Sequence, residues 1–517
     1  MKKNTKDFER SKIDWMITLL PLAIIVGLCI LFFFLPEQSN KIISQIRFVL
    51  GDTFGVYYLI IGLGVFLISF YVAGSKYGNI VLGSPNEKPK YSFFAWGSMM
   101  FTAGLAADIL FYSFSEWILY ATDPHIAELG SIQDWSSVYP IFHWSLIPWG
   151  FYLVLAVAFG FMLHVRKRER QKYSEACRPI LGKHTDGLGG RLIDLLAVFA
   201  LIAGTATTFG LATPLMSSVI NELFHVQLNR TVVTIVILIV TCVIYTYSLL
   251  HGFKGISILA KSCVYLFFGL LAFVLLFGGE AKYIIETGVS ALGRMVQNFF
   301  ELATYTDPQR TTSFPQNWTI FYWAYWMVWC VATPFFIGKI SKGRTIKNTI
   351  LGGYGWGLAG TFTSFIILGN YGLAQQMKHG IDISGMIAKS GDYSTVILKI
   401  FDTLPLASLG LLLLVITMIA FYSTTFDALT MVVSSYSYKK LDVDEEPDKK
   451  IRVFWAIIFI LFPIALIFAE NSMYSLQSVA IIAAFPIGFI ILMIVISFFK
   501  DANKYLQEKK ANNRDIE

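Results

Sequence analysis

The sequence contains little charge. Of its 517 residues, 15% are Asp, Glu, Lys or Arg, whereas 55% are hydrophobic. Soluble domains average about 25% charged residues, so a soluble globular protein is excluded. Long apolar runs are abundant instead, which predicts an all-α integral membrane protein that crosses the lipid bilayer many times.

Cysteine and histidine are also scarce. The seven histidines form no HExxH motif, and the sequence contains no CxxC pair and no GxSxG motif. The five cysteines are scattered without a pairing or metal-binding spacing, at Cys29, Cys177, Cys242, Cys263 and Cys330. This pattern argues against a disulfide framework, a metal centre, a cofactor and an enzyme with catalytic residues.

The apolar runs and the basic loops between them predict the topology. Twelve spans are expected near 14–35, 52–74, 92–121, 137–165, 191–221, 231–250, 256–279, 318–338, 346–373, 406–436, 451–470 and 474–499. Lys and Arg concentrate in alternate loops, at 166–172, 339–347 and 439–450. The positive-inside rule therefore places both termini in the cytoplasm of a cell-membrane protein. The net charge of +7 reflects these loops and does not indicate a nucleic-acid partner.

Several predicted spans contain residues that interrupt a continuous apolar helix. The third reads FFAWGSMMFTAGLAADILF and mixes small residues with Asp108, and the tenth contains FYSTTFD, which ends at Asp427. A carboxylate within the membrane is costly and by default faces a cavity or a partner. Broken helices with polar groups at the midplane are typical of alternating-access transporters. A channel is the alternative from another class, but no carbonyl-type filter sequence is visible.

Two of the spans carry aromatic residues at helical spacing. Such groups are consistent with core packing, or with a box of π faces around a cation that cannot donate hydrogen bonds. A quaternary ammonium fits such a box, since each desolvated face supplies roughly 0.5–2 kcal/mol. The residues are Trp144, Trp149 and Tyr152 in FHWSLIPWGFY, and Trp323, Trp326 and Trp329 in FYWAYWMVWC.

The sequence resembles the betaine/carnitine/choline transporter family over nearly the whole chain. The most specific match is FPQNWTIFYWAYWMVW with ISKGRTIK, within 314–347, and FHWSLIPWGFY matches the second aromatic segment of the family. YTDP at 305–308 and GLATPL at 210–215 look particularly like the bacterial carnitine/γ-butyrobetaine exchangers.

The resemblance implies a fold and an assembly. It implies a homotrimer with twelve transmembrane helices, in which spans 3–12 form a LeuT-type 5+5 inverted repeat preceded by two extra helices. The expected segments are a cytoplasmic tail at 1–13, two transmembrane helices in 14–90, a first repeat at 91–279, an external interfacial helix and loop at 280–317, a second repeat at 318–499 and a cytoplasmic tail at 500–517.

The resemblance also implies a function and a substrate site. The family transports choline, glycine betaine, carnitine or γ-butyrobetaine by alternating access. Its aromatic box corresponds here to Trp144, Trp149, Tyr152 and Trp326. Trp323 and Trp329 match other tryptophans of the segment, and Trp329 is expected toward the cytoplasmic path. Tyr325 stands where the family usually has Trp, so the box gains a hydroxyl.

Residues that match the coupling sites of the family favour an ion. Ser257 and Thr333 replace the arginine and the methionine that stand in for ions in the carnitine exchangers. Sodium-coupled members carry Thr-Ser-x-Asp in span ten, and this chain has Thr424, Thr425 and Asp427 there. Hydroxyls and carbonyls at a helix break suit Na⁺, although such threonines also commonly bond to their own helix. Uptake coupled to Na⁺ or H⁺ is expected, and sodium-independent exchange is the alternative. Further candidate ligands are Leu105 and Thr205.

Asp108 is the other departure from the family. The family stretch has the form GMGIG, whereas this chain reads GLAAD, from Gly104 to Asp108. A carboxylate beside the substrate favours choline, because a zwitterion such as betaine meets repulsion unless Asp108 is protonated. Alternatively, Asp108 titrates and couples transport to protons, or it only caps a neighbouring broken helix.

Overall fold

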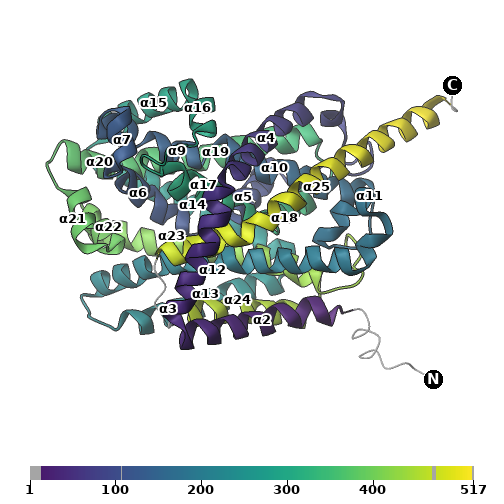
Figure 1. Ribbon diagram of the computed structural model, residues 1–517, viewed down its shortest axis with the longest axis horizontal. Coiled ribbons are helices and arrows are strands. Elements are labelled where there is room, and N and C mark those ends of the chain that lie inside the picture. Colours follow the sequence, from purple (N-terminus) through teal and green to yellow (C-terminus); the bar gives the residue numbers. More distant parts are fainter. Residues whose placement is uncertain (1–12, 106, 468–472, 515–517) are drawn as a thin grey trace.

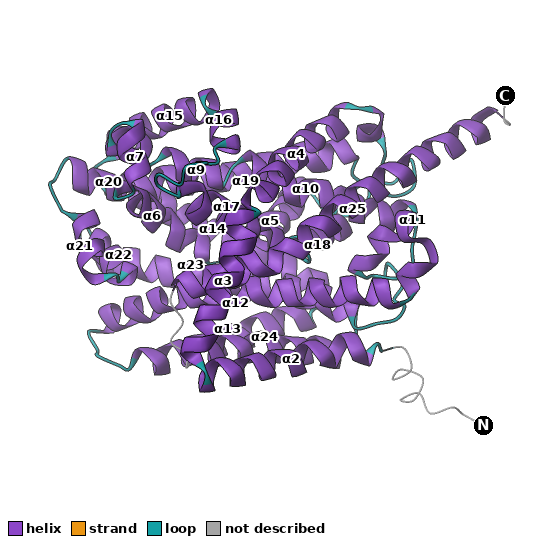
Figure 2. Ribbon diagram, in the orientation of Figure 1, coloured by secondary structure: helices purple, strands orange, loops and turns teal. Residues whose placement is uncertain are grey.

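The protein is helical throughout the part of the chain that the structure describes. This computed structural model describes residues 13–105, 107–467 and 473–514. Within these ranges no strand occurs, and only two isolated β-bridges join loop segments. Figure 2 shows helices connected by short loops. The prediction of an all-α protein is confirmed.

The helices follow the predicted apolar runs closely. The α-helices up to residue 277 are α2 (Trp15–Phe34), α3 (Pro36–Arg47), α4 (Gly55–Gly74), α5 (Phe93–Gly104), α6 (Asp108–Ala121), α7 (Pro124–Leu129), α8 (Ile132–Trp135), α9 (Val138–His143), α10 (Leu146–Gly160), α11 (Arg178–Leu181), α12 (Leu188–Phe224), α13 (Arg230–Leu250) and α14 (Gly252–Phe277). Those after it are α15 (Ala281–Gln297), α16 (Phe299–Thr304), α17 (Ile320–Trp329), α18 (Thr333–Ile340), α19 (Ile346–Ser364), α20 (Asn370–Met377), α21 (Ile383–Ser390), α22 (Tyr393–Asp402), α23 (Ala407–Tyr436), α24 (Lys449–Ile467) and α25 (Met473–Arg514).

The number of helices that can cross a membrane is eight among the described residues, or ten if each bent pair counts as one span. Two of the twelve predicted spans do not meet this criterion. In α2 the apolar stretch is Trp15–Ile24, which is shorter than the 18 residues that the criterion requires. In α24 the first turn carries three basic residues, and the description stops at Ile467. The total of twelve therefore stays a prediction.

Two spans are bent at a break, and each is the first helix of a predicted repeat. The α5–α6 pair bends by 59° and the α17–α18 pair by 50°. In the first break Leu105 has an extended backbone, which interrupts the helical hydrogen bonds. In the second, Pro334 lies in the first turn of α18, where its missing N–H favours a new helix start. At the breaks, carbonyl and N–H groups lack a partner within their own helix, so they can bond to other elements or to a ligand.

The segment at 280–317 contains the helices α15 and α16, and α15 leaves apolar residues exposed. Helix α15 buries Ile284, Ala291 and Met295, whereas Ile285 and Val289 on other faces are exposed. A helix that is apolar on its exposed face is suited to a membrane interface.

Two segments rich in Lys and Arg are also helical in part. The loop after α10 forms the 3-10 turn Tyr173–Cys177, the single turn α11 and the 3-10 turn Gly182–Asp186, and Glu175 there makes ion pairs with Arg170 and Arg178. Residues 500–514 of the expected cytoplasmic tail continue helix α25, which ends at Arg514. No Gly or Pro interrupts 500–514, so the helix propagates. In Figure 1 the start of α2 and the end of α25 lie on the side of the molecule that carries α11.

Candidate substrate and ion sites

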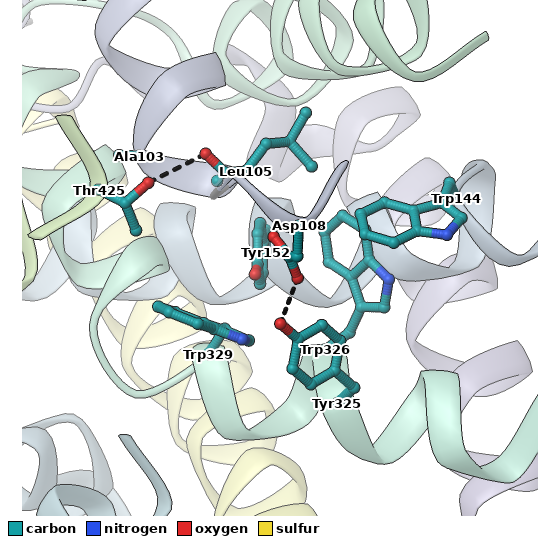
Figure 3. A pocket seen from close by; sticks show the side chains of 10 residues that line it. Ala103, Leu105, Asp108, Trp144, Tyr152, Tyr325, Trp326, Trp329 and Thr425 are labelled. Atoms are coloured by element: carbon teal, nitrogen blue, oxygen red, sulfur yellow. Dashed lines mark hydrogen bonds between the residues drawn. The ribbon is translucent and has the colours of Figure 1, made fainter. Parts of the chain in front are cut away.

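A small pocket lies where the two broken spans meet. Its open volume is about 10 Å³, close to what a single water molecule needs. A larger ligand therefore requires the surrounding rings to move apart. Figure 3 shows the pocket from close by. It is lined by Ala103 and Gly104 of α5, Leu105 of the break, Asp108 of α6, Trp144 directly after α9, Tyr152 of α10, three residues of α17 (Tyr325, Trp326 and Trp329), and Thr425 of α23.

The predicted aromatic groups meet around Trp326. The centroid of its ring lies 4.8 Å from that of Tyr152 and 5.6 Å from that of Trp144. Trp149 lies behind these rings, with its centroid 5.6 Å from that of Trp326. At Gly104 a Cβ atom would come within 3.1 Å of the Trp149 indole. The absence of a side chain at Gly104 thus lets the broken span approach the aromatic wall.

The three tryptophans of α17, Trp323, Trp326 and Trp329, do not all face the pocket. Positions three residues apart on a helix step back by about 60°, so Trp323 and Trp329 point about 120° apart. Trp329 lines the pocket, and its ring centroid lies 6.3 Å from that of Tyr325, with the two ring planes at 89°. Trp323 instead packs on Phe142 at 5.4 Å and lies against Gly62 of α4. The structure therefore brings Trp329 to the pocket and places Trp323 outside it.

Asp108 faces the pocket from the first turn of α6. Its side chain is 3% exposed, and it accepts a short hydrogen bond from the Tyr325 hydroxyl, which also bonds to Thr208 (Figure 3 shows the first of these). The N-terminal end of a helix stabilises a negative charge. None of the described residues that line the pocket is cationic. The pocket thus combines one carboxyl group with several aromatic faces.

A second set of oxygen atoms surrounds the α5–α6 break. The Thr425 hydroxyl lies 3.0 Å from the carbonyl oxygen of Leu105 and 3.1 Å from that of Thr102. On the other side of the break, the Thr333 hydroxyl donates to the carbonyl of Ala103 at 3.0 Å. Hydroxyl and carbonyl oxygens from three spans therefore converge on one break, which is the ligand chemistry that hard cations prefer.

The other predicted ion ligands lie elsewhere. Thr424 donates to Phe421 O, and Thr205 to Ile202 O, each within its own helix. Asp427 is fully buried but turns toward α13, where its Oδ2 accepts from Ser248 at 2.7 Å. The spacing on α23 explains this separation, because Thr425 and Asp427 are two residues apart and so point about 200° apart.

Three residues near the sites were not predicted as part of them. Thr333 was predicted only as the replacement for the methionine of the carnitine exchangers, because its neighbours at the break depend on the tertiary structure. Glu116 and His143 were not singled out, although Glu116 is an ionisable residue within a span, and this signal alone makes a residue a functional candidate. Both are fully buried next to Trp144.

Comparison with known proteins identifies the family. The sequence model of the betaine/carnitine/choline family transporters matches residues 16–507. The glycine betaine transporter OpuD of Bacillus subtilis (strain 168) is 30% identical over 494 residues, which cover 93% of each chain. A probable glycine betaine transporter of Desulfitobacterium hafniense (strain Y51) is 30% identical over 475 residues, covering 90% of this chain and 93% of the relative.

Solved structures are similar at a greater distance. A Na⁺-coupled sialic acid symporter in a substrate-bound outward-open state is 13% identical, with a TM-score of 0.49, and the match covers 87% of this chain and 86% of that chain. The family match over nearly the whole chain decides the class. The protein belongs to the betaine/carnitine/choline transporter family, and it is a multi-pass membrane transporter and not an enzyme.

Proposed function

We propose that this protein is a secondary active transporter that takes up a quaternary ammonium cation by alternating access, prefers choline to zwitterions such as glycine betaine, and is driven by Na⁺. The observation that carries the choice of substrate is the carboxyl group of Asp108 inside an aromatic pocket. The named relatives transport glycine betaine, so the proposal assigns this chain a different preferred substrate within the same family.

The charge balance of the pocket supports a substrate that has no carboxylate. A trimethylammonium group makes apolar contacts with its methyl groups and electrostatic contacts with ring faces, and it donates no hydrogen bond. Choline brings one positive charge and a hydroxyl, so an ionised Asp108 neutralises it. Glycine betaine brings its own carboxylate, and the described lining offers that carboxylate no cationic partner. Betaine would bind well only if Asp108 were protonated.

The polar tyrosine of the box fits the same substrate. Tyr325 of α17, where the family usually has Trp, donates a hydrogen bond to the Asp108 carboxyl group. Thr208 of α12 shares a hydrogen bond with the Tyr325 hydroxyl. The hydroxyl of choline is small and finds hydrogen-bonding groups at this end of the pocket. Carnitine and γ-butyrobetaine are longer zwitterions, and they would place a carboxylate against the same Asp108.

The oxygen cluster at the α5–α6 break supports coupling to Na⁺. Thr425 and Thr333 contribute hydroxyls from two other helices, so an ion there would fasten the broken span to both and favour the conformation that holds the substrate. Coupling to H⁺ through Asp108 is the second possibility. Sodium-independent exchange has less support, because Ser257 and Thr333 occupy the positions of the ion substitutes.

The assembly and orientation follow the family and the charge pattern. We include in the proposal a homotrimer in the cell membrane, which the family resemblance supports. Both termini are assigned to the cytoplasm, which the concentration of Lys and Arg in alternate loops supports.

Uptake into proteoliposomes tests the function. Labelled choline, glycine betaine, carnitine and γ-butyrobetaine would be supplied with an inward Na⁺ gradient, an inward H⁺ gradient or no gradient. The proposal predicts concentrative uptake of choline only with Na⁺. Uptake that requires γ-butyrobetaine or carnitine inside, and no ion gradient, would contradict the proposal and identify an exchanger.

A further inference from the structure

A buried acid–histidine pair lies directly behind the aromatic box. Glu116 of α6 and His143 at the end of α9 are both 0% exposed, and the His143 Nδ1 lies 3.2 Å from the Glu116 Oε1. The other carboxylate oxygen, Oε2, accepts a hydrogen bond from the indole N–H of Trp144 at 2.8 Å. Trp144 lines the substrate pocket, so the pair is one indole ring away from the transported molecule.

The hydrogen bonds around the pair can be assigned one by one. Tyr120 has a single proton, which it donates to Glu116 Oε1 at 2.6 Å. Its oxygen lies 2.8 Å from His143 Nδ1, so Nδ1 carries a proton and donates it to Tyr120. The second ring nitrogen, Nε2, lies 3.0 Å from the Thr319 hydroxyl. That hydroxyl donates to a neutral histidine and, after rotation, accepts from a protonated one.

This arrangement lets His143 gain or lose a proton without loss of a hydrogen bond. With neutral histidine and ionised Glu116 the cluster has a charge of −1, and with protonated histidine it is neutral. The other titratable groups that face the pair are tyrosines, namely Tyr112 and Tyr120 of α6, Tyr139 of α9 and Tyr322 of α17. Tyrosines ordinarily remain protonated near neutral pH. The groups of this region that can exchange protons there are therefore the pair itself, Asp108 at the start of α6, and His125, which is separated from His143 by Tyr139.

We propose that Glu116 and His143 form a proton-binding pair that positions Trp144 and sets how tightly the box holds its cation, such that a proton on His143 weakens cation binding. This inference rests on the proposed transport of a quaternary ammonium cation. Glu116 acts through Trp144 in two ways: it fixes the plane of the indole, and its negative charge makes the indole face a better partner for a cation. A proton on His143 cancels that charge.

The two variants of the pair are expected to behave differently. Glu116→Gln keeps the shape but removes the charge, so choline affinity should fall about tenfold at about pH 8, because a charge-assisted bond becomes a neutral one. The difference from the wild type should shrink toward about pH 5, where the proton on His143 already cancels the charge. In His143→Asn, an amide nitrogen takes the place of Nδ1 but cannot acquire a charge. This variant should keep the full affinity at acid pH, where the wild-type protein loses about 5- to 20-fold between about pH 8 and 5.

The experiment is equilibrium binding of labelled choline to the purified full-length protein across that pH range, for the wild type and both variants. Asp108→Asn is the control for the other carboxyl group, and in it the pH dependence due to His143 should persist. A wild-type pH profile that remains in His143→Asn would overturn the inference, and so would an unchanged affinity in Glu116→Gln at about pH 8. If Glu116→Gln does not fold, His143→Asn decides the matter.

A second measurement needs no substrate. The ultraviolet resonance Raman band of Trp144, obtained as the difference between wild type and Trp144→Phe, reports the strength of the indole hydrogen bond. It should shift with pH in the wild type and not in His143→Asn. An absent shift contradicts the proton-binding pair. Failure to bind any quaternary ammonium, with the Raman shift present, would contradict the proposed function instead.

Discussion

Replacement of Asp108 by Asn should remove the preference for choline. The substitution keeps the size of the side chain and a carbonyl oxygen that can accept from Tyr325, but it removes the negative charge from the pocket. The neighbouring hydrogen bonds need little adjustment, because the Tyr325 hydroxyl can donate to an amide oxygen as it does to a carboxylate. Changes in binding therefore report mainly the charge.

The magnitude follows from the position of the carboxyl group among the lining rings. Two unit charges about 4 Å apart attract by about 4 kcal/mol at an effective dielectric constant of about 20. The lost hydration of the carboxylate and of the ligand offsets part of this attraction, so we expect a net contribution of about 2 kcal/mol. About 2 kcal/mol corresponds to roughly 30-fold in affinity. For glycine betaine the attraction of its ammonium and the repulsion of its carboxylate largely cancel, so its affinity should change by less than about threefold.

The assay is titration of tryptophan fluorescence with choline and with glycine betaine, since Trp144, Trp326 and Trp329 line the pocket. Tyr325→Phe is the matched control, because it disturbs the same hydrogen bond and leaves the charge. This control should still prefer choline. Equal losses for the two ligands in Asp108→Asn, or unchanged choline affinity, would refute the electrostatic role of Asp108 and leave only a structural one.

Three further predictions test other parts of the account. Trp326→Ala should weaken choline binding by roughly 1–3 kcal/mol, whereas Trp323→Ala, outside the pocket, should leave affinity unchanged; equal effects in a fluorescence titration would contradict the pocket. Thr425→Ala should raise the Na⁺ concentration for half-maximal uptake about tenfold, and Thr424→Ala, which bonds to its own helix, should not; a shift only in Thr424→Ala would exclude the site at the break. Asp501→Asn breaks partly buried ion pairs with two arginines, so trypsin should cleave the end of α25 about tenfold faster, and unchanged cleavage would show that these pairs do not hold it.

The helices were largely predictable because each follows from local sequence. The interruption expected in span three is a break after Gly104, but the one expected in span ten is wrong, because α23 runs unbroken from Ala407 to Tyr436. Apolar runs long enough to cross a bilayer must form helices, since no water satisfies their backbone there. Pro334 and the small residues that follow Gly104 mark the breaks for the same local reason. The continuation of α25 past residue 499 was not predicted, because the charged residues that begin at Lys500 were taken as the end of the helix. Charged residues end the part of a helix that can lie in the bilayer, but they do not end the helix itself.

The sites were predictable only in part because they depend on contacts between distant segments. The two aromatic segments could be assigned to one box from their residue types and from the family resemblance, and the structure places Trp144, Tyr152 and Trp326 together. Which way Trp323 points depends on α4, and which way Asp427 points depends on α13. Neither neighbour can be known from the sequence of the residue's own helix.

The central claim is that the pocket selects a cation without a carboxylate, and the most direct measurement is competition at neutral pH. Labelled choline bound to the wild-type protein would be displaced with unlabelled choline or unlabelled glycine betaine, in the presence of Na⁺. The account predicts that roughly ten times more glycine betaine than choline is needed for half displacement. Half displacement at a lower concentration of glycine betaine than of choline would contradict it.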